Sequence, residues 1–190
     1  MKPIAILCSL PLFLAVPSTV ALAQELPSAV GEVNAAPGHM TGQEFAESVL
    51  SSDLFEIDSG KLAANQAVAP QVKHFGEQMA DAHAKTTANL EEVLDRIVLG
   101  QYVTPPPKLD PRHEEMYNEL QVAQGTAFDE LYVRQQLAAH REAVAVLQGY
   151  AANGKEAALQ HYAAGTLPIV QQHLTMLSQI RTETGATANR

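Results

Sequence analysis

Two long segments with the residue spacing of amphipathic helices lie close together near the start of the chain, with only a few residues between them. The first covers residues 42–67 and follows Thr41-x-x-Glu44, a capping box in which each side chain binds the other residue's backbone N–H. The second covers residues 70–99, begins with a proline and is followed by a glycine. Because the joint is so short, the two helices must form an antiparallel hairpin.

A long interruption separates this hairpin from the rest of the chain. Three consecutive prolines, Pro105–Pro107, favour an extended connection, and a short helix is expected at residues 112–123. Ten extended residues at ~3.1 Å each reach roughly 30 Å, which is about the length of the helix before them. The connection can therefore cross the whole bundle, and we expect the second and third long helices to run parallel.

Two further long helices are predicted after this crossover, at residues 126–152 and 154–182. Each is preceded by the pattern of a capping box: Thr126-x-x-Asp129 and Asn153-x-x-Glu156. The run Gly165–Pro168 predicts a kink or a break in the last helix. Since strand-forming runs are scarce, we expect an all-α four-helix bundle with a long crossover between the second and third helices and one short extra helix.

The first 23 residues have the pattern of a secretory signal peptide. Lys2 gives a positive start, and Ala21-Leu22-Ala23 is a small-x-small cleavage site. The apolar run between them, Ile4 to Val16, is shorter than the roughly 20 residues of a membrane-spanning helix. We therefore expect a periplasmic or secreted protein without a transmembrane segment after cleavage, with a membrane anchor as the alternative. Cleavage would also remove Cys8, the only cysteine.

The remaining domain boundaries follow from composition. Residues 24–40 contain Pro and Gly with little periodicity and are expected to be a flexible leader, residues 41–183 the bundle domain, and residues 184–190 a disordered tail. The net charge of -9 argues against a nucleic-acid partner, because such proteins need a basic surface. Protein partners stay open, and a homo-oligomer is one possibility.

Each long helix carries one ionisable side chain at the centre of its apolar stripe, when residues are placed at 100° intervals. These side chains are Glu56, His83, His140 and His173, in chain order. The small residues Gly60 and Ala63, which follow Glu56 on its stripe, would allow another helix to approach closely.

The rise of 1.5 Å per residue gives the depth of these side chains in the bundle. Glu56, His83 and His140 are expected at one level, and the predicted kink leaves the level of His173 open. The other histidines fit this pattern less well, because His74 and His161 lie off the stripes and His39 and His113 are expected in linkers.

Several motifs resemble a bacterial secreted family catalogued as domain of unknown function 4142. They are Phe55-Glu56-Ile57-Asp58-Ser59-Gly60-Lys61-Leu62-Ala63, Val72-Lys73-His74-Phe75 leading to Met79 and His83, Phe128-Asp129-x-x-Tyr132, His140, and Leu167-Pro168 with His173-Leu174. The resemblance implies a ferritin-like four-helix fold and an exported protein, without an established activity. One position departs from the family, whose members usually have an acid just before the second-helix histidine, where this chain has Ala82.

Three functions remain open from the sequence. The first is a non-catalytic envelope or stress-related module, in which the buried Glu and His residues satisfy one another by hydrogen bonds. The alternative is a mononuclear site in which Glu56, His83, His140 and His173 bind a single transition-metal ion. A di-iron oxidase fits least, because its Glu-x-x-His pattern is missing: Ala80 precedes His83 by three residues, and Val170 precedes His173.

Overall fold

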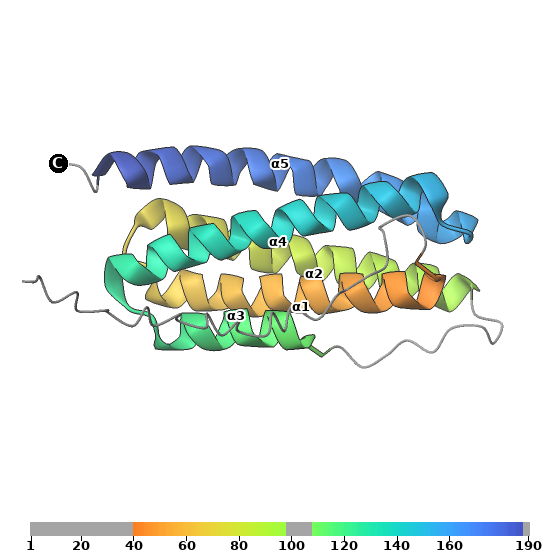
Figure 1. Ribbon diagram of the computed structural model, residues 1–190, viewed down its shortest axis with the longest axis horizontal. Helices are drawn as coiled ribbons and strands as arrows, with labels where there is room; N and C mark the ends of the chain where they lie inside the picture. The colour runs from red at the N-terminus through yellow and green to blue at the C-terminus, as the bar shows by residue number, and fades with distance from the viewer. Residues whose placement is uncertain (1–39, 98–107, 188–190) are drawn as a thin grey trace, which may run out of the picture. The chain divides into compact units, whose positions relative to one another are not determined.

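The computed structural model describes residues 40–97 and 108–187, with side chains described as far as residue 181. In these ranges the chain is all-α, with five helices and no strand. The five helices belong to one compact unit (Figure 1). The expected signal peptide, nearly all of the leader, His39, Pro105–Pro107 and the end of the second helix lie outside the described residues.

Helices α1 (Gly42–Gln66) and α2 (Pro70–Ile97) form the predicted antiparallel hairpin (Figure 1). The capping box of α1 is confirmed, since the Glu44 N–H donates to Thr41 Oγ1 at 3.2 Å and the Thr41 N–H donates to Glu44 Oε2 at 2.8 Å. The predicted close approach is also present. A Cβ added at Gly60 would lie 2.6 Å from the carbonyl oxygen of Gly76, so the two backbones are nearly in contact.

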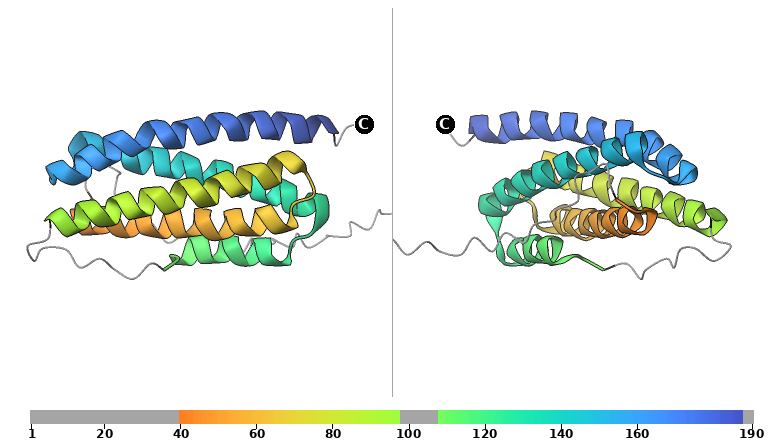
Figure 2. Two further views of the ribbon diagram at one scale, coloured as in Figure 1. Left: turned by 180° about the vertical axis from the view of Figure 1, so that it is seen from behind. Right: turned by 45° about the vertical axis from the view of Figure 1, so that its right-hand side comes forward.

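Helix α3 (Pro111–Val122) is the predicted short extra helix, and it lies along the outside of α1 (Figure 2). Its N-cap is Asp110, whose carboxylate accepts the backbone N–H groups of Arg112 and His113. His113 was expected in a linker, and this expectation is wrong, because the side chain is buried in α3.

Helices α4 (Gly125–Asn153) and α5 (Ala157–Thr187) form a second antiparallel hairpin, and α4 runs parallel to α2 as predicted (Figure 1). Two predicted capping boxes are wrong. Asp129 instead accepts the backbone N–H groups of Val68 and Ala69 at 3.1 and 2.8 Å, which ties α4 to the turn between α1 and α2. Asn153 remains inside α4, where its side-chain amide donates to the Gly149 carbonyl.

The last helix also differs from its prediction. It begins at Ala157 rather than at residue 154, and it continues through Pro168 without a break. It ends at Thr187, beyond the predicted end at residue 182. Among the described helices, none combines the length and the hydropathy that a bilayer-spanning segment requires.

The core consists of two apolar clusters at opposite ends of the four long helices. One cluster includes Phe55, Phe75, Met79 and Leu177, and the other includes Phe45, Leu90, Leu147 and Leu159, among others. Every long helix passes from one cluster to the other, and it carries its buried ionisable side chain near the crossing point. The fold thus places a polar layer between two apolar ones.

Candidate metal centre

Three histidines from three helices converge in the polar layer. His83 of α2, His140 of α4 and His173 of α5 are 3%, 1% and 6% exposed. The centroids of their rings lie 5.4 to 5.6 Å apart, so the rings form a nearly equilateral triangle. Three ring nitrogens, one from each histidine, lie within 4.8 Å of one another. We call these three residues the histidine cluster.

The ring of His83 is held by a buried carboxylate on α1. Its Nδ1 donates to Asp53 Oδ1 at 2.7 Å, and Asp53 Oδ2 accepts the hydroxyls of Thr86 and Thr87 at 2.8 and 3.1 Å. A proton on Nδ1 leaves the lone pair of the neutral ring on Nε2. His83 Nε2 is buried and has no hydrogen-bond partner among the described residues. Since a buried polar atom without a partner is costly, this nitrogen is suited to bind a ligand.

His140 is oriented in a similar way by its own helix. Its Nδ1 donates to the carbonyl oxygen of Gln136 at 3.0 Å, while its Nε2 faces His173 Nδ1 at 3.4 Å. The hydrogen bond to the carbonyl turns Nε2, with its lone pair, toward the cluster.

Glu56 lies next to the histidine cluster rather than inside it. Its Oε1 is 3.4 Å from His140 Nδ1, on the edge of the ring that faces away from His173. Its Oε2 is buried without a hydrogen-bond partner among the described residues. Of the four residues expected at the site, the structure therefore brings three together and places the fourth behind one of them.

Burial and neighbouring charges set the ionisation of the cluster. Burial, followed by the charges of His83 and His173, lowers the pKa of His140 well below its ordinary value. Burial and the charge of His83 lower the pKa of His173 to about 4. Both rings are therefore neutral at pH 7, which is the form that binds metals.

His83 and Glu56 behave differently from these two rings. Burial lowers the pKa of His83, but the hydrogen bond and charge of Asp53 and the charge of Glu56 outweigh it, so the net shift is upward. Burial raises the pKa of Glu56 to about 7, against the opposing effects of His83 and Gln136. The Glu56 carboxyl is therefore poised between its neutral and charged forms near neutral pH.

The donor set fits a small transition-metal ion. Two imidazole nitrogens bound tetrahedrally at 2.0–2.1 Å from zinc lie about 3.3–3.4 Å apart. The His140–His173 pair already has this spacing, and the two pairs that include His83 lie within 4.8 Å, so they would have to close by at most about 1.4 Å. The hydrogen bonds of His83 and His140 through Nδ1 are the usual way in which a protein orients metal-binding histidines.

Asp53 was not identified from the sequence, although a signal was present. It precedes Glu56 by three residues, so both carboxylates lie on the same face of α1, and Asp53 is 4% exposed. His74 and His161 are exposed on α2 and α5, as predicted.

The family model of a domain of unknown function, DUF4142, matches residues 28–180 of the chain. The chain belongs to the DUF4142 family. This DUF4142 chain matches none of the curated proteins at a significant level.

Two solved structures share the fold of this DUF4142 domain. One is a DUF305 protein from Streptomyces coelicolor that is inferred to be secreted, with 14% identity, a TM-score of 0.61, and coverage of 74% of this chain and 91% of that one. The other is CopM in its Cu(II)-bound form, with 17% identity, a TM-score of 0.62, and coverage of 74% of this chain and 95% of that one. At these identities the likeness concerns the fold alone.

Proposed function

We propose that this DUF4142 domain binds a single transition-metal ion through His83, His140 and His173. The observation that carries the proposal is the convergence of three buried imidazoles whose ligand atoms lie within 4.8 Å of one another. The unpartnered Nε2 of His83 supports it, because an ion would satisfy this buried atom. Asp53 and the Gln136 carbonyl orient two of the rings.

Glu56, which the sequence suggested as a fourth ligand, is assigned to a supporting position in this proposal. It lies 3.4 Å from Nδ1 of His140, whereas Nε2 of that ring is the atom that faces the cluster. A carboxylate in this position balances part of the charge of a bound cation. The fourth coordination position is then left to water or to an exogenous ligand.

One ion is favoured over two by the number of carboxylates. Asp53, Glu56 and Asp129 are the acidic residues buried in the described part of the chain, and Asp129 is engaged at the turn between α1 and α2. Di-iron proteins of the ferritin-like class use four Glu residues and two His residues. A di-iron oxidase therefore has less support than a mononuclear site.

Copper and zinc are the first ions to test. Imidazole donors suit zinc, copper, iron and nickel, and copper(II) has the highest general affinity among divalent ions of this series. The fold is shared with CopM, whose structure contains Cu(II), and this likeness is a reason to include copper in the test.

We also propose that the domain is exported and that its bundle is of the ferritin-like class. The arrangement of two antiparallel hairpins joined by one long connection, with α2 parallel to α4, is the topology of that class (Figure 1). The predicted signal peptide and the DUF305 structure of an inferred secreted protein support export. The proposed role is binding of the ion, with no reaction assigned.

A non-catalytic scaffold is the second candidate. The pairs Asp53–His83 and His140–His173 already satisfy part of the polar layer by hydrogen bonds, so the network is able to fix the register of the helices without an ion.

The two candidates are separated by titrating the purified mature protein with Zn(II) and Cu(II) in separate experiments. The metal-binding proposal predicts one ion per chain and a loss of at least about 100-fold in affinity for His173→Ala. The matched control is His161→Ala, which removes an exposed histidine of the same helix and should leave binding unchanged. A wild type that binds neither ion stoichiometrically would support the scaffold instead.

A further inference from the structure

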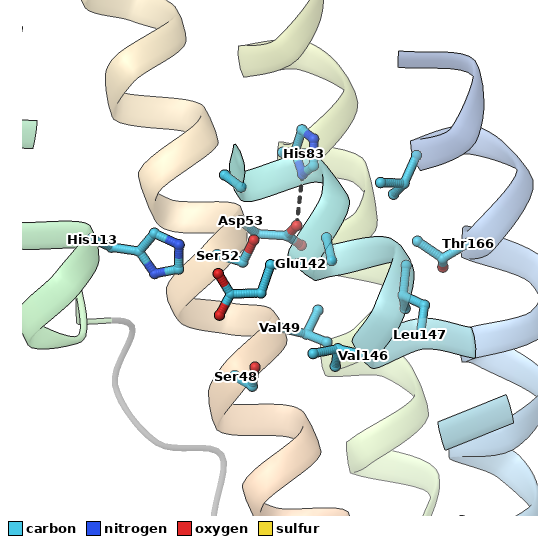
Figure 3. Close-up of a pocket in the computed structure, with 13 residues that line it drawn as sticks. Ser48, Val49, Ser52, Asp53, His83, His113, Glu142, Val146, Leu147 and Thr166 are labelled. Carbon is cyan, nitrogen blue, oxygen red and sulfur yellow. Dashed lines mark hydrogen bonds and ion pairs between the residues drawn. The ribbon is translucent and has the colours of Figure 1, made fainter. Parts of the chain in front are cut away.

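A small cavity lies beside the histidine cluster, between α1 and α4 (Figure 3). Its volume is about 30 Å³, and its lining includes the exposed Glu142 and the half-buried Ser48 and Ser52. The buried pair Asp53 and His83 also lines it. The cavity therefore extends from the surface of the bundle to the carboxylate–imidazole pair at the edge of the cluster.

We propose that this cavity is the route by which a metal ion reaches the histidine cluster, an inference that rests on the proposed function. His83 is the residue that the cavity and the cluster share, since His140 and His173 do not line the cavity. An ion that follows this route meets the cluster first at His83.

The lining of the cavity has the chemistry that such a route requires. Three hydroxyls and two carboxylates lie along it, from Ser48, Ser52, Thr166, Asp53 and Glu142, between apolar side chains such as Val49 and Val146. Its described lining contains no Lys or Arg. These oxygens can replace part of the hydration shell of a cation as it enters. At the outer end, Arg112 of α3 pairs with Glu142 and offsets part of its charge.

The size of the cavity limits what can pass. A volume of about 30 Å³ has room for about one or two water molecules. A partly dehydrated ion fits this space, whereas a metal bound to a bulky chelator does not. The ion pair between Arg112 and Glu142 ties α3 to α4 at the outer end of the cavity, so the mouth is held by two helices.

The route is tested by narrowing it. Ala143 lines the cavity and is half-buried, so Ala143→Leu should obstruct it, whereas Ala145→Leu on the same helix changes an exposed residue outside the lining. Ser48→Leu narrows the opposite wall and serves as a second variant if Ala143→Leu does not fold. Stopped-flow measurements of Zn(II) uptake and release, together with the equilibrium affinity, are made for the wild type and each variant.

We expect Ala143→Leu to slow uptake and release by about tenfold each and to leave the affinity unchanged, because a route affects both directions equally. Ala145→Leu should match the wild type. Unchanged uptake and release in both Ala143→Leu and Ser48→Leu would overturn the route while leaving the proposed function intact.

A second measurement tests the route without a metal. Exchange of the His83 Cε1 hydrogen with D₂O, followed by mass spectrometry, reports access of water to this ring. Ala143→Leu should slow this exchange severalfold, with no change at the exposed His74. If the wild type binds no ion, the proposed function fails, and equal exchange rates at His83 in the wild type and the variant would then overturn the route separately.

Discussion

The described part of the chain contains two aspartate–histidine pairs with nearly the same nitrogen–oxygen distance and different surroundings. Asp53 and His83 lie 2.7 Å apart between α1 and α2, with side chains 6% and 4% exposed. Asp110 and His113 lie 2.6 Å apart at the start of α3, where the Asp110 side chain is 42% exposed. Both pairs involve the same stretch of α1, because Ser51 donates to Asp110 at 2.8 Å only two residues before Asp53.

The difference between the pairs lies in what surrounds the rest of each ring. His83 has its free Nε2 among the rings of His140 and His173. His113 stacks on Phe55, with ring centroids 5.1 Å apart, and shares its Nδ1 between Asp110 and Ser51.

The Asp110–His113 pair therefore holds the start of α3 against α1. Partial burial raises the pKa of Asp110, but hydrogen bonds from the side chain and backbone of His113 outweigh this effect and lower it. An aspartate–histidine pair forms part of a candidate metal centre only where the remaining nitrogen meets further donors.

The largest difference between the two pairs is expected when His83 and His113 are each replaced by Ala. Saturating Zn(II) should stabilise the wild type by about 4 kcal/mol when the free ion exceeds Kd 1,000-fold. His83→Ala should abolish this stabilisation, whereas His113→Ala should keep it from a lower starting stability. Thermal unfolding with and without the ion measures both. Equal metal-dependent shifts in the two variants would show that the pairs do not differ as described.

The next largest effect concerns Glu56, which is buried behind His140. Its pKa is raised to about 7 in the folded protein, from an ordinary value of 4.5. The neutral carboxyl therefore makes its full contribution to the stability of the folded protein below pH 4.5. This contribution is lost as the pH rises through 7, because the buried group then becomes charged. Glu56→Gln should raise the stability of the metal-free protein by roughly 3 kcal/mol at pH 8, since each pKa unit is 1.36 kcal/mol, and should change it little at pH 4.5.

Urea unfolding at the two pH values provides this measurement. Because the charge of Glu56 also raises the pKa of His83, the difference between the two proteins includes this coupling, and repeating the comparison in a His83→Gln background isolates the carboxyl. A Glu56→Gln variant that is less stable than the wild type at pH 8 would contradict the assigned environment of this carboxyl.

A smaller effect is expected for the carboxylate of the first pair. Asp53→Asn should lower metal affinity about 10- to 100-fold, because a metal-binding histidine loses its orienting acceptor. The matched control is Asp58→Asn, a half-buried residue of the same helix. Nitrogen NMR of His83 provides a direct readout, since the variant should lose the preference for a proton on Nδ1. An unchanged tautomer with unchanged affinity would remove Asp53 from the centre.

The smallest expected effect concerns Asp110, in the second aspartate–histidine pair. Asp110→Ala removes the N-cap of α3 and should cost about 1 kcal/mol of stability, without changing metal affinity. Urea unfolding measures the first quantity and a zinc titration the second. Weaker zinc binding in this variant would mean that the position of α3 affects the histidine cluster.

The sequence carried most of the information on the long helices, because local signals determine them. The stripe positions of Glu56, His83, His140 and His173 and the capping box at Thr41 depend on residues within one helix. All four side chains are buried where the stripes predicted.

The predictions were wrong where the contacts of a side chain depend on a segment distant in the sequence. Asp129 has the spacing of a capping residue, but the turn between α1 and α2 offers it two backbone N–H groups. His113 falls in the short helix predicted at residues 112–123 but was expected in a linker, because its burial depends on the packing of α3 on α1. Which ring nitrogen faces the cluster also depends on partners in other turns and helices, so the position of Glu56 behind His140 was not predictable from the helical pattern.

X-ray absorption at the zinc edge, on protein loaded with one equivalent of Zn(II), shows directly which ligands surround the ion. We expect three imidazole ligands at about 2.0–2.1 Å from the zinc ion. A zinc ion surrounded mainly by oxygen, or with fewer than two imidazoles, would contradict a centre built from His83, His140 and His173.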